Sequence, residues 1–135
     1  MRSIKKLITG ILAGVVSVLF CASMVTAASV EIKAKDGIGS YLTDEKGMTL
    51  YLFKKDVAGK SACAGACVEK WPLFAVETVT VPEGVKGTDF GTILREDGKK
   101  QTTYKGLPLY YYFKDVKPGD TEGQGVYDVW HVVAP

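Results

Sequence analysis

The stretch KGMTLYLFKKDV at residues 46–57 recurs as KGLPLYYYFKDV at residues 105–116, an offset of 59 residues. The same offset relates Trp71 to Trp130, without an insertion between the copies. Self-similarity at a fixed spacing indicates that a fold is built from similar units. We therefore predict two pseudo-symmetric units, with repeats at about residues 39–74 and 90–133.

The first residues have the pattern of a secretory signal peptide. Three basic residues precede an apolar run at residues 7–20, and small residues follow up to Ala27. This order of charged, apolar and small residues is typical of a segment removed on export. We expect a signal peptide at residues 1–27 and a mature domain at 28–135, periplasmic or extracellular. The alternatives are an uncleaved N-terminal anchor, or a lipid anchor at Cys21 even though Phe20, which is not small, precedes it.

Charge limits the class of partner. The predicted signal peptide holds three of the 17 basic residues and none of the 15 acidic ones, so residues 28–135 carry 14 − 15 = −1. A nearly neutral chain without a basic run lacks the electrostatic footprint of a nucleic-acid binder. We expect the partner to be an envelope protein or a small ligand, with no nucleic acid. Contact with the membrane is expected only through the signal peptide or the lipid anchor.

Short apolar or β-branched runs alternate with turn signals, which is typical of a β domain. Asp97-Gly98 provides the residues of a tight hairpin turn. Ser61 is a candidate cap for a short helix at 62–70, which Pro72 would end. The fold class that we predict is mostly β, a single small domain of two antiparallel β repeats with one short helix or turn. The expected strands are 29–33, 40–43, 48–53, 78–81, 90–95, 100–104, 109–113 and 126–133.

Cys63 and Cys67 remain once the signal peptide is removed. An even pair of cysteines in an exported protein is most simply a disulfide, which would pin the short helix or an irregular turn. A thiol redox pair is an alternative, although the usual signature has two intervening residues rather than three. A copper site is another, with the two cysteines, the single histidine His131, and Met48 as soft ligands.

The repeated motif has a structural and a functional interpretation. In a strand, Tyr51 and Phe53 share one face, and Asp56 follows where the strand ends. Such residues are expected to pack the core, with the aspartate capping the next turn through backbone N–H groups. The alternative is a tyrosine-lined pocket for a flat ligand. The motif residues are Tyr51, Phe53, Asp56, Trp71, Tyr110, Tyr112, Asp115 and Trp130.

Two further residues are candidates for ligand binding. Tyr110, Tyr111 and Tyr112 alternate along one strand, so they point to both faces and at least one is expected to be exposed. Tyr111 is therefore a candidate, together with His131. Matched positions that differ between the copies are where we expect function, as at Pro72 and His131, or at Cys63 and Glu122.

Several segments together resemble one family. Tyr51-x-Phe53-x-x-Asp56 and its copy fit a Y-x-(F/W/Y)-x-x-D motif. The chain from about Gly39 to Pro135 resembles a family of predicted bacterial secreted lipoproteins, described as a secreted repeat of unknown function. The resemblance implies an envelope location and brings no catalytic residues. The other matching segments are Cys63-x-Gly65-x-Cys67 with Trp71-Pro72, Arg95-x-Asp97-Gly98, Gln101-x-Thr103-Tyr104, Gly106-x-Pro108-Leu109-Tyr110, Pro118-Gly119-Asp120 and Trp130-x-Val132.

No enzyme class is indicated. The sequence has no Cys-x-x-Cys-His for covalent haem, and one histidine leaves too few ligands for a zinc site. A Ser-His-Asp set would require arbitrary partners for His131. We predict a non-enzymatic binding or accessory protein of the bacterial cell envelope, without a catalytic site, metal or cofactor. The alternatives are a redox accessory that binds haem or quinone non-covalently, a copper protein using Cys63, Cys67 and His131, and a carbohydrate-binding or cell-wall module.

Overall fold

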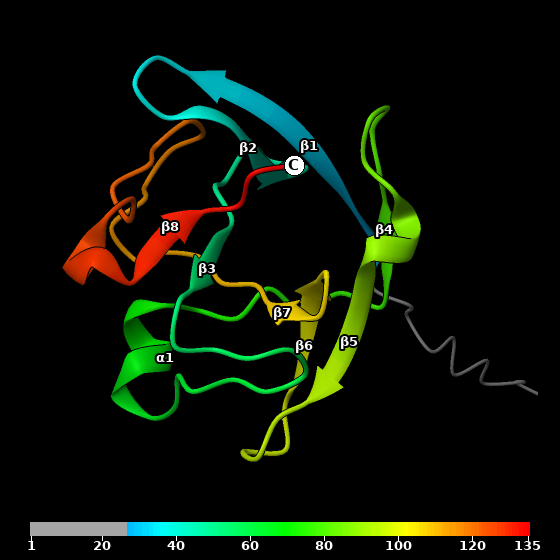
Figure 1. The fold of residues 1–135 in the computed structure, drawn as a ribbon, viewed down its shortest axis with the longest axis vertical. Helices are drawn as coiled ribbons and strands as arrows, with labels where there is room; N and C mark the ends of the chain where they lie inside the picture. Colours follow the sequence, from blue (N-terminus) through cyan, green and yellow to red (C-terminus); the bar gives the residue numbers. More distant parts are fainter. Residues whose placement is uncertain (1–26) are drawn as a thin grey trace, which may run out of the picture.

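The computed structural model describes residues 27–135 (Figure 1). The predicted signal peptide and the lipid-anchor position Cys21 therefore lie outside the described residues, apart from Ala27. Of the helices within 27–135, none has the length and apolar character needed to cross a membrane. The elements are β1 (Ala27–Lys35), β2 (Gly39–Asp44), β3 (Tyr51–Phe53), α1 (Ala66–Lys70), β4 (Thr78–Thr80), η1 (Gly87–Asp89), β5 (Phe90–Leu94), β6 (Lys100–Tyr104), β7 (Leu107–Pro108), η2 (Val126–Asp128) and β8 (Trp130–Val132).

The strands form three small sheets. β1 lies between β2 and β4, antiparallel to β2 and parallel to β4. β5, β6 and β7 form an antiparallel sheet. The predicted Asp97-Gly98 turn connects β5 to β6, and Gly98 has a φ of 82°. β3 pairs with β8. The prediction of a mostly β domain with two repeats and one short helix beside the cysteine pair is confirmed.

The two repeats exchange their last segments. β3 of the first repeat pairs with β8 of the second, and Figure 1 shows the two strands side by side. The counterpart runs the other way: residues 109–113 of the second repeat receive the end of the first. Three backbone hydrogen bonds of 2.7–3.1 Å hold these two segments together. The N–H groups of Phe74, Tyr111 and Phe113 donate to the carbonyls of Leu109, Pro72 and Lys70, respectively. The Tyr-bearing segment of each repeat therefore pairs with the last segment of the other repeat.

The centre of this exchange is the contact between Tyr51 and Tyr110. The Tyr51 N–H donates to the Tyr110 carbonyl at 2.8 Å, and the Tyr110 N–H donates to the Tyr51 carbonyl at 3.1 Å. These residues occupy the same position in the two copies. A local two-fold axis therefore passes between them and relates the repeats.

The alternation of side chains along the motif separates two hydrophobic clusters. Leu50 and Leu109 belong to the first, while the adjacent Tyr51 and Tyr110 belong to the second. The first cluster is Val30, Leu42, Leu50, Phe74, Val85, Tyr104, Leu109 and Val133. The second is Tyr41, Tyr51, Cys63, Trp71, Tyr110, Tyr112, Trp130 and Val132.

The predicted strand at 109–113 is wrong as a regular strand, and a proline explains why. Leu52 pairs with His131 in the β3–β8 ladder, and the matched pair is Tyr111 with Pro72. The Tyr111 N–H still donates to the Pro72 carbonyl at 2.7 Å. Proline has no N–H to return the bond, so the ladder is interrupted there.

Other boundaries also need correction. The helix begins at Ala66 rather than at 62, and its N-cap is Gly65, without a side-chain cap. Ser61 does not cap it, because its hydroxyl bonds Tyr110 and the Arg95 guanidinium instead. The predicted strand at 126–133 is a 3₁₀ turn followed by β8, and the one at 48–53 shortens to β3. The predicted strand at 29–33 lengthens to β1, which pairs on both sides.

Candidate functional site

Each motif tyrosine bonds the motif aspartate of the other repeat. The Tyr51 hydroxyl donates to Asp115 Oδ2 at 2.6 Å, and the Tyr110 hydroxyl donates to Asp56 Oδ2 at 2.7 Å. Both tyrosines are fully buried. Hydrogen bonds to an ionised carboxylate are among the stronger ones in proteins, so the two pairs link the repeats in addition to the backbone exchange.

The second oxygen of each aspartate caps the loop that follows. Asp56 Oδ1 accepts from the Ala62 N–H at 2.6 Å, and Asp115 Oδ1 accepts from the Glu122 N–H at 2.9 Å. The capping expected from the sequence is therefore confirmed. The tyrosine partner was missed, because the motif places Tyr51 and Asp56 in one repeat and gives no sign that each bonds across to the other.

The tyrosine hydroxyls have further partners. The Gly123 N–H donates to the Tyr51 hydroxyl at 3.1 Å, and the Tyr110 hydroxyl lies 2.6 Å from Ser61 Oγ. Among residues 27–135, no buried side-chain nitrogen or oxygen lacks a hydrogen-bond partner. The polar groups around the motif are therefore committed to one another.

Burial shifts the pKa values of these groups. Desolvation is the largest cause raising the pKa of the Asp56 and Asp115 carboxyls, against which the hydrogen bonds from backbone and tyrosine act. Burial and the neighbouring aspartate raise the pKa of the Tyr51 and Tyr110 hydroxyls strongly. Both tyrosines therefore remain neutral hydrogen-bond donors at physiological pH.

Four aromatic rings stack across the two-fold axis. Trp71 and Trp130 are stacked with centroids 3.7 Å apart and planes 3° apart. Phe53 stacks on Trp130 at 4.1 Å, and Tyr112 stacks on Trp71 at 4.2 Å. Phe53 and Tyr112 are matched positions of the repeat. The order Phe53, Trp130, Trp71, Tyr112 thus joins the motif aromatics of both repeats into one column.

Arg95 links the second repeat to the cysteine loop of the first. Its guanidinium donates to the Cys63 carbonyl at 2.5 Å, to Ser61 Oγ at 2.7 Å and to Gln101 Oε1 at 2.7 Å. Asp97 supplies the opposite charge, with 3.1 Å between Arg95 Nε and Asp97 Oδ2. Arg95 is only 7 % exposed, so its charge serves to hold this loop.

Cys63 and Cys67 form a disulfide with their Cα atoms 5.4 Å apart. The bond spans the start of α1, and Cys63 is buried in the second hydrophobic cluster. Because the two sulfurs bond each other, they do not offer thiolates to the copper site considered with His131. Among residues 27–135, no group of three or more His, Cys, Asp or Glu side chains is arranged to hold a metal ion.

The structure separates the two candidate ligand-binding residues. The Tyr111 hydroxyl donates to Asp44 Oδ2 at 2.9 Å, and its ring packs edge-on against Phe74. Tyr111 is therefore half-buried within the structure rather than displayed, contrary to the expected exposure. His131 is also half-buried, but it lines an open hollow of about 370 Å³ beside η2. The hollow is lined by Lys54, Gln124, Gly125, Asp128, Trp130 and His131.

The repeats differ most around this hollow. In the first repeat the position is taken by α1, which the disulfide pins; in the second it is taken by η2, which has no cysteines. Tyr127 and Asp128 in η2 both have left-handed backbone, with φ of 51° and 59°. Side chains other than glycine rarely adopt this conformation, and strain of this kind clusters at functional sites. The Tyr127 side chain is 87 % exposed. Two mismatches in the sequence signal this difference, Pro72 against His131 and Cys63 against Glu122.

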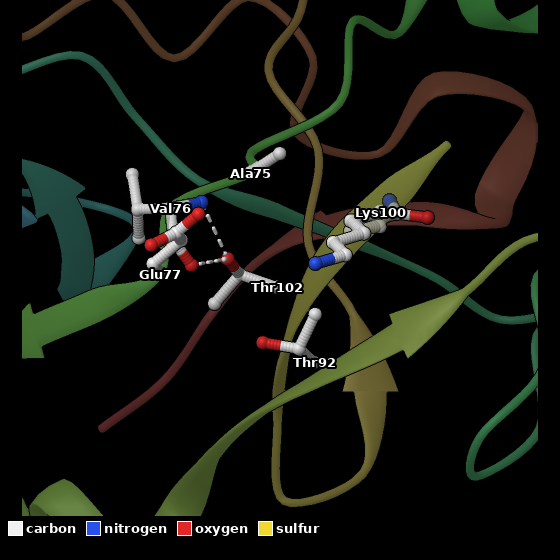
Figure 2. Close-up of a pocket in the computed structure, with 7 residues that line it drawn as sticks. Ala75, Val76, Glu77, Thr92, Lys100 and Thr102 are labelled. Atoms are coloured by element: carbon white, nitrogen blue, oxygen red, sulfur yellow. Dashed lines mark hydrogen bonds between the residues drawn. The ribbon is translucent and has the colours of Figure 1, made fainter. Parts of the chain in front are cut away.

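A second hollow of about 360 Å³ lies between the segment at residues 75–77 and the strands β5 and β6 (Figure 2). Lys100 extends into it from β6 and Thr92 from β5, with Val76 and Glu77 on the other side. The Thr102 hydroxyl is bonded to both the N–H and the carbonyl of Val76, at 2.9 and 3.1 Å. Its lining holds no histidine, cysteine or aromatic side chain, so it is the weaker candidate for recognising a ligand.

A family model described as a secreted repeat of unknown function matches residues 32–75 and 91–134. The chain belongs to this family. It carries two copies of the repeat, at the spacing that the motifs predict. A search of curated proteins and a search of solved structures found no match.

Proposed function

We propose that this secreted repeat protein is a non-enzymatic binding module of the bacterial envelope. The η2 hollow, defined by Lys54, Gln124, Gly125, Asp128, Trp130 and His131, is its ligand site. The observation that carries the proposal is the broken symmetry at this place. A disulfide-pinned helix in one repeat is replaced in the other by a strained turn, an exposed tyrosine and a hollow.

The absence of a catalytic role is supported by how the reactive side chains are used. The carboxylates of Asp56 and Asp115 bond tyrosine and backbone, and Arg95 holds the cysteine loop. A catalytic acid or base needs to reach a substrate proton, and these groups face inward. The hollow instead offers Lys54, Asp128 and His131 beside Tyr127, which suits recognition of a small polar ligand with a flat or ring-shaped part.

The experiment is an NMR titration of the ¹⁵N-labelled mature protein. The probes are soluble cell-wall glycopeptide fragments, a water-soluble quinone and haem, which represent the ligand classes that the sequence left open. We expect one of them to shift amide signals of residues 124–131 and of Lys54. Tyr127→Ala or His131→Ala should weaken the binding, whereas Phe113→Ala, at the position matched to Lys54, should not.

Two results would refute the proposal. One is a titration in which none of the three probes shifts these signals. The other is binding whose shifts lie elsewhere and which survives both Tyr127→Ala and His131→Ala.

A further inference from the structure

Two buried tyrosines each lie between a carboxylate and a tryptophan. The Tyr51 ring meets Trp71 edge-on with centroids 5.5 Å apart, while its hydroxyl bonds Asp115. The Tyr110 ring meets Trp130 edge-on at 5.1 Å, while its hydroxyl bonds Asp56. The arrangement therefore occurs twice, related by the two-fold axis between the repeats.

The tryptophans connect both arrangements to each other and to the surface. Trp71 and Trp130 are only 4 % and 3 % exposed, and their rings are in stacking contact. Tyr112 stacks on Trp71 and meets Phe113 edge-on at 5.3 Å. Phe113 is half-exposed, so the aromatic contacts continue from the core to the edge of the domain.

Indole and phenol are the aromatic side chains that lose one electron most readily. An oxidised phenol is a strong acid, so its oxidation is favourable only when the hydroxyl proton has an acceptor at hydrogen-bond distance. Asp115 Oδ2 and Asp56 Oδ2 are such acceptors, at 2.6 and 2.7 Å. Desolvation raises the pKa of both carboxyls, which favours their holding a proton.

We propose that the aromatic core is a one-electron relay, in which the Trp71–Trp130 pair passes an oxidising equivalent to Tyr51 or Tyr110. The initial oxidant is a small oxidising radical, which takes one electron from an indole. The tyrosine then returns one electron to that indole. Its O–H bond breaks as the proton forms an O–H bond on the aspartate, leaving a neutral tyrosyl radical and a neutral carboxylic acid. Return of one electron and the same proton restores the pair.

This role does not require a ligand at the η2 hollow, although Trp130 belongs to both. The hydroxyl that links the repeats is also the group that makes each tyrosine oxidisable, which a phenylalanine in the same space would not be. The chain also contains its own control. Tyr111 donates to Asp44 in a similar hydrogen bond, but its ring packs on Phe74 and not on either tryptophan.

The test is laser flash photolysis of the mature protein, which ejects an electron from the tryptophans. Dissolved dioxygen captures that electron as superoxide. We expect the tryptophan radical absorption to convert into that of a tyrosyl radical, at a rate independent of protein concentration. Tyr51→Phe/Tyr110→Phe should abolish the conversion, whereas Tyr111→Phe/Tyr127→Phe should leave it intact. Conversion that persists in the first double variant, or is lost in the second, would overturn the relay.

The proton step is tested separately. Asp56→Asn/Asp115→Asn should slow the conversion, and Asp44→Asn should not. If the former variant does not fold, the wild-type protein in D₂O supplies the answer, because transfer of the hydroxyl proton makes the conversion slower there than in H₂O. An identical rate in both solvents would overturn the proton-coupled step, and so the role given to the aspartates.

Discussion

At Gly123 the chain passes directly over the ring of Tyr51. A Cβ at this position would lie 2.7 Å from Tyr51 and 3.0 Å from Trp71, both of which are locked in the core. Gly123→Ala should therefore destabilise the fold by about 1–3 kcal/mol, through overpacking. Urea unfolding measures this. Gly87→Ala is the control, because its nearest contact would be 3.9 Å from Val81, and a loss as large there would contradict the explanation.

Protonation of the buried Asp115 carboxyl should make the stability of the fold depend on pH. Burial raises the pKa of Asp115 in the folded state above its unfolded value, so the folded protein binds the proton more tightly. The stability of wild type relative to Asp115→Asn should therefore increase as the pH falls from neutral toward about 4, and level off below the unfolded pKa of about 3.9.

Asp120 is the matched control, because its pKa is shifted the other way. Two backbone N–H groups, of Val116 and Lys117, hydrogen-bond its carboxylate and lower the pKa. Relative to Asp120→Asn, wild type should lose stability as the pH falls through that lowered pKa. Denaturant midpoints measured from neutral pH to below the lowered pKa of Asp120 decide both signs. A difference of the same sign for the two variants would contradict the assignment.

At the scale of elements, the pairing of β3 with β8 depends on a residue with an N–H at position 131. The backbone of Tyr51 faces Tyr110, so that of Leu52 faces His131 on the opposite side of the strand. His131→Pro should interrupt this ladder, as Pro72 does at the matched place, and cost about 1 kcal/mol more than His131→Ala, which keeps the N–H. Thermal unfolding of both variants tests this, and equal stabilities would refute it.

The elements that depend on local sequence signals were predicted, and those that depend on a distant partner were not. The 59-residue register and the Asp97-Gly98 turn predicted two β units and the β5–β6 hairpin, since these depend on local signals. The interruption opposite Tyr111 was not predicted, although Pro72 is visible in the sequence, because its effect depends on which segment pairs with it. Ser61 was expected to cap the helix, but the Tyr110 hydroxyl and Arg95 compete for it.

At the scale of the whole molecule, the repeats are halves of one fold rather than two domains. Each provides the segment that pairs with the other's Tyr-bearing strand, the aspartate that bonds the other's tyrosine, and the tryptophan that stacks on the other's tryptophan. An internal repeat shows that two units are alike, but it does not show which copy supplies each partner. The aspartates of the motif were expected to cap the turns that follow, and they do. The hydrogen bond from Tyr51 to Asp115 was not predicted, because it joins one copy to the other.

The same view explains where the candidate site lies. A two-fold arrangement places equivalent surfaces on both repeats, and the ligand site that we propose lies where this equivalence fails. The first repeat has the disulfide and α1 at this place, and the second has η2 with Tyr127. Cys63 against Glu122 was visible as a mismatch in the sequence. The strained turn and the hollow were not, because they depend on the backbone conformation of Tyr127 and Asp128.

The exchange between repeats is tested most directly by double-mutant cycles in urea unfolding. Tyr51→Phe combined with Asp115→Ala should show a coupling of about 1 kcal/mol or more, as should Tyr110→Phe with Asp56→Ala. Tyr51→Phe combined with Asp56→Ala, within one repeat, should be close to additive. Strong coupling within a repeat, together with additivity between repeats, would contradict the account.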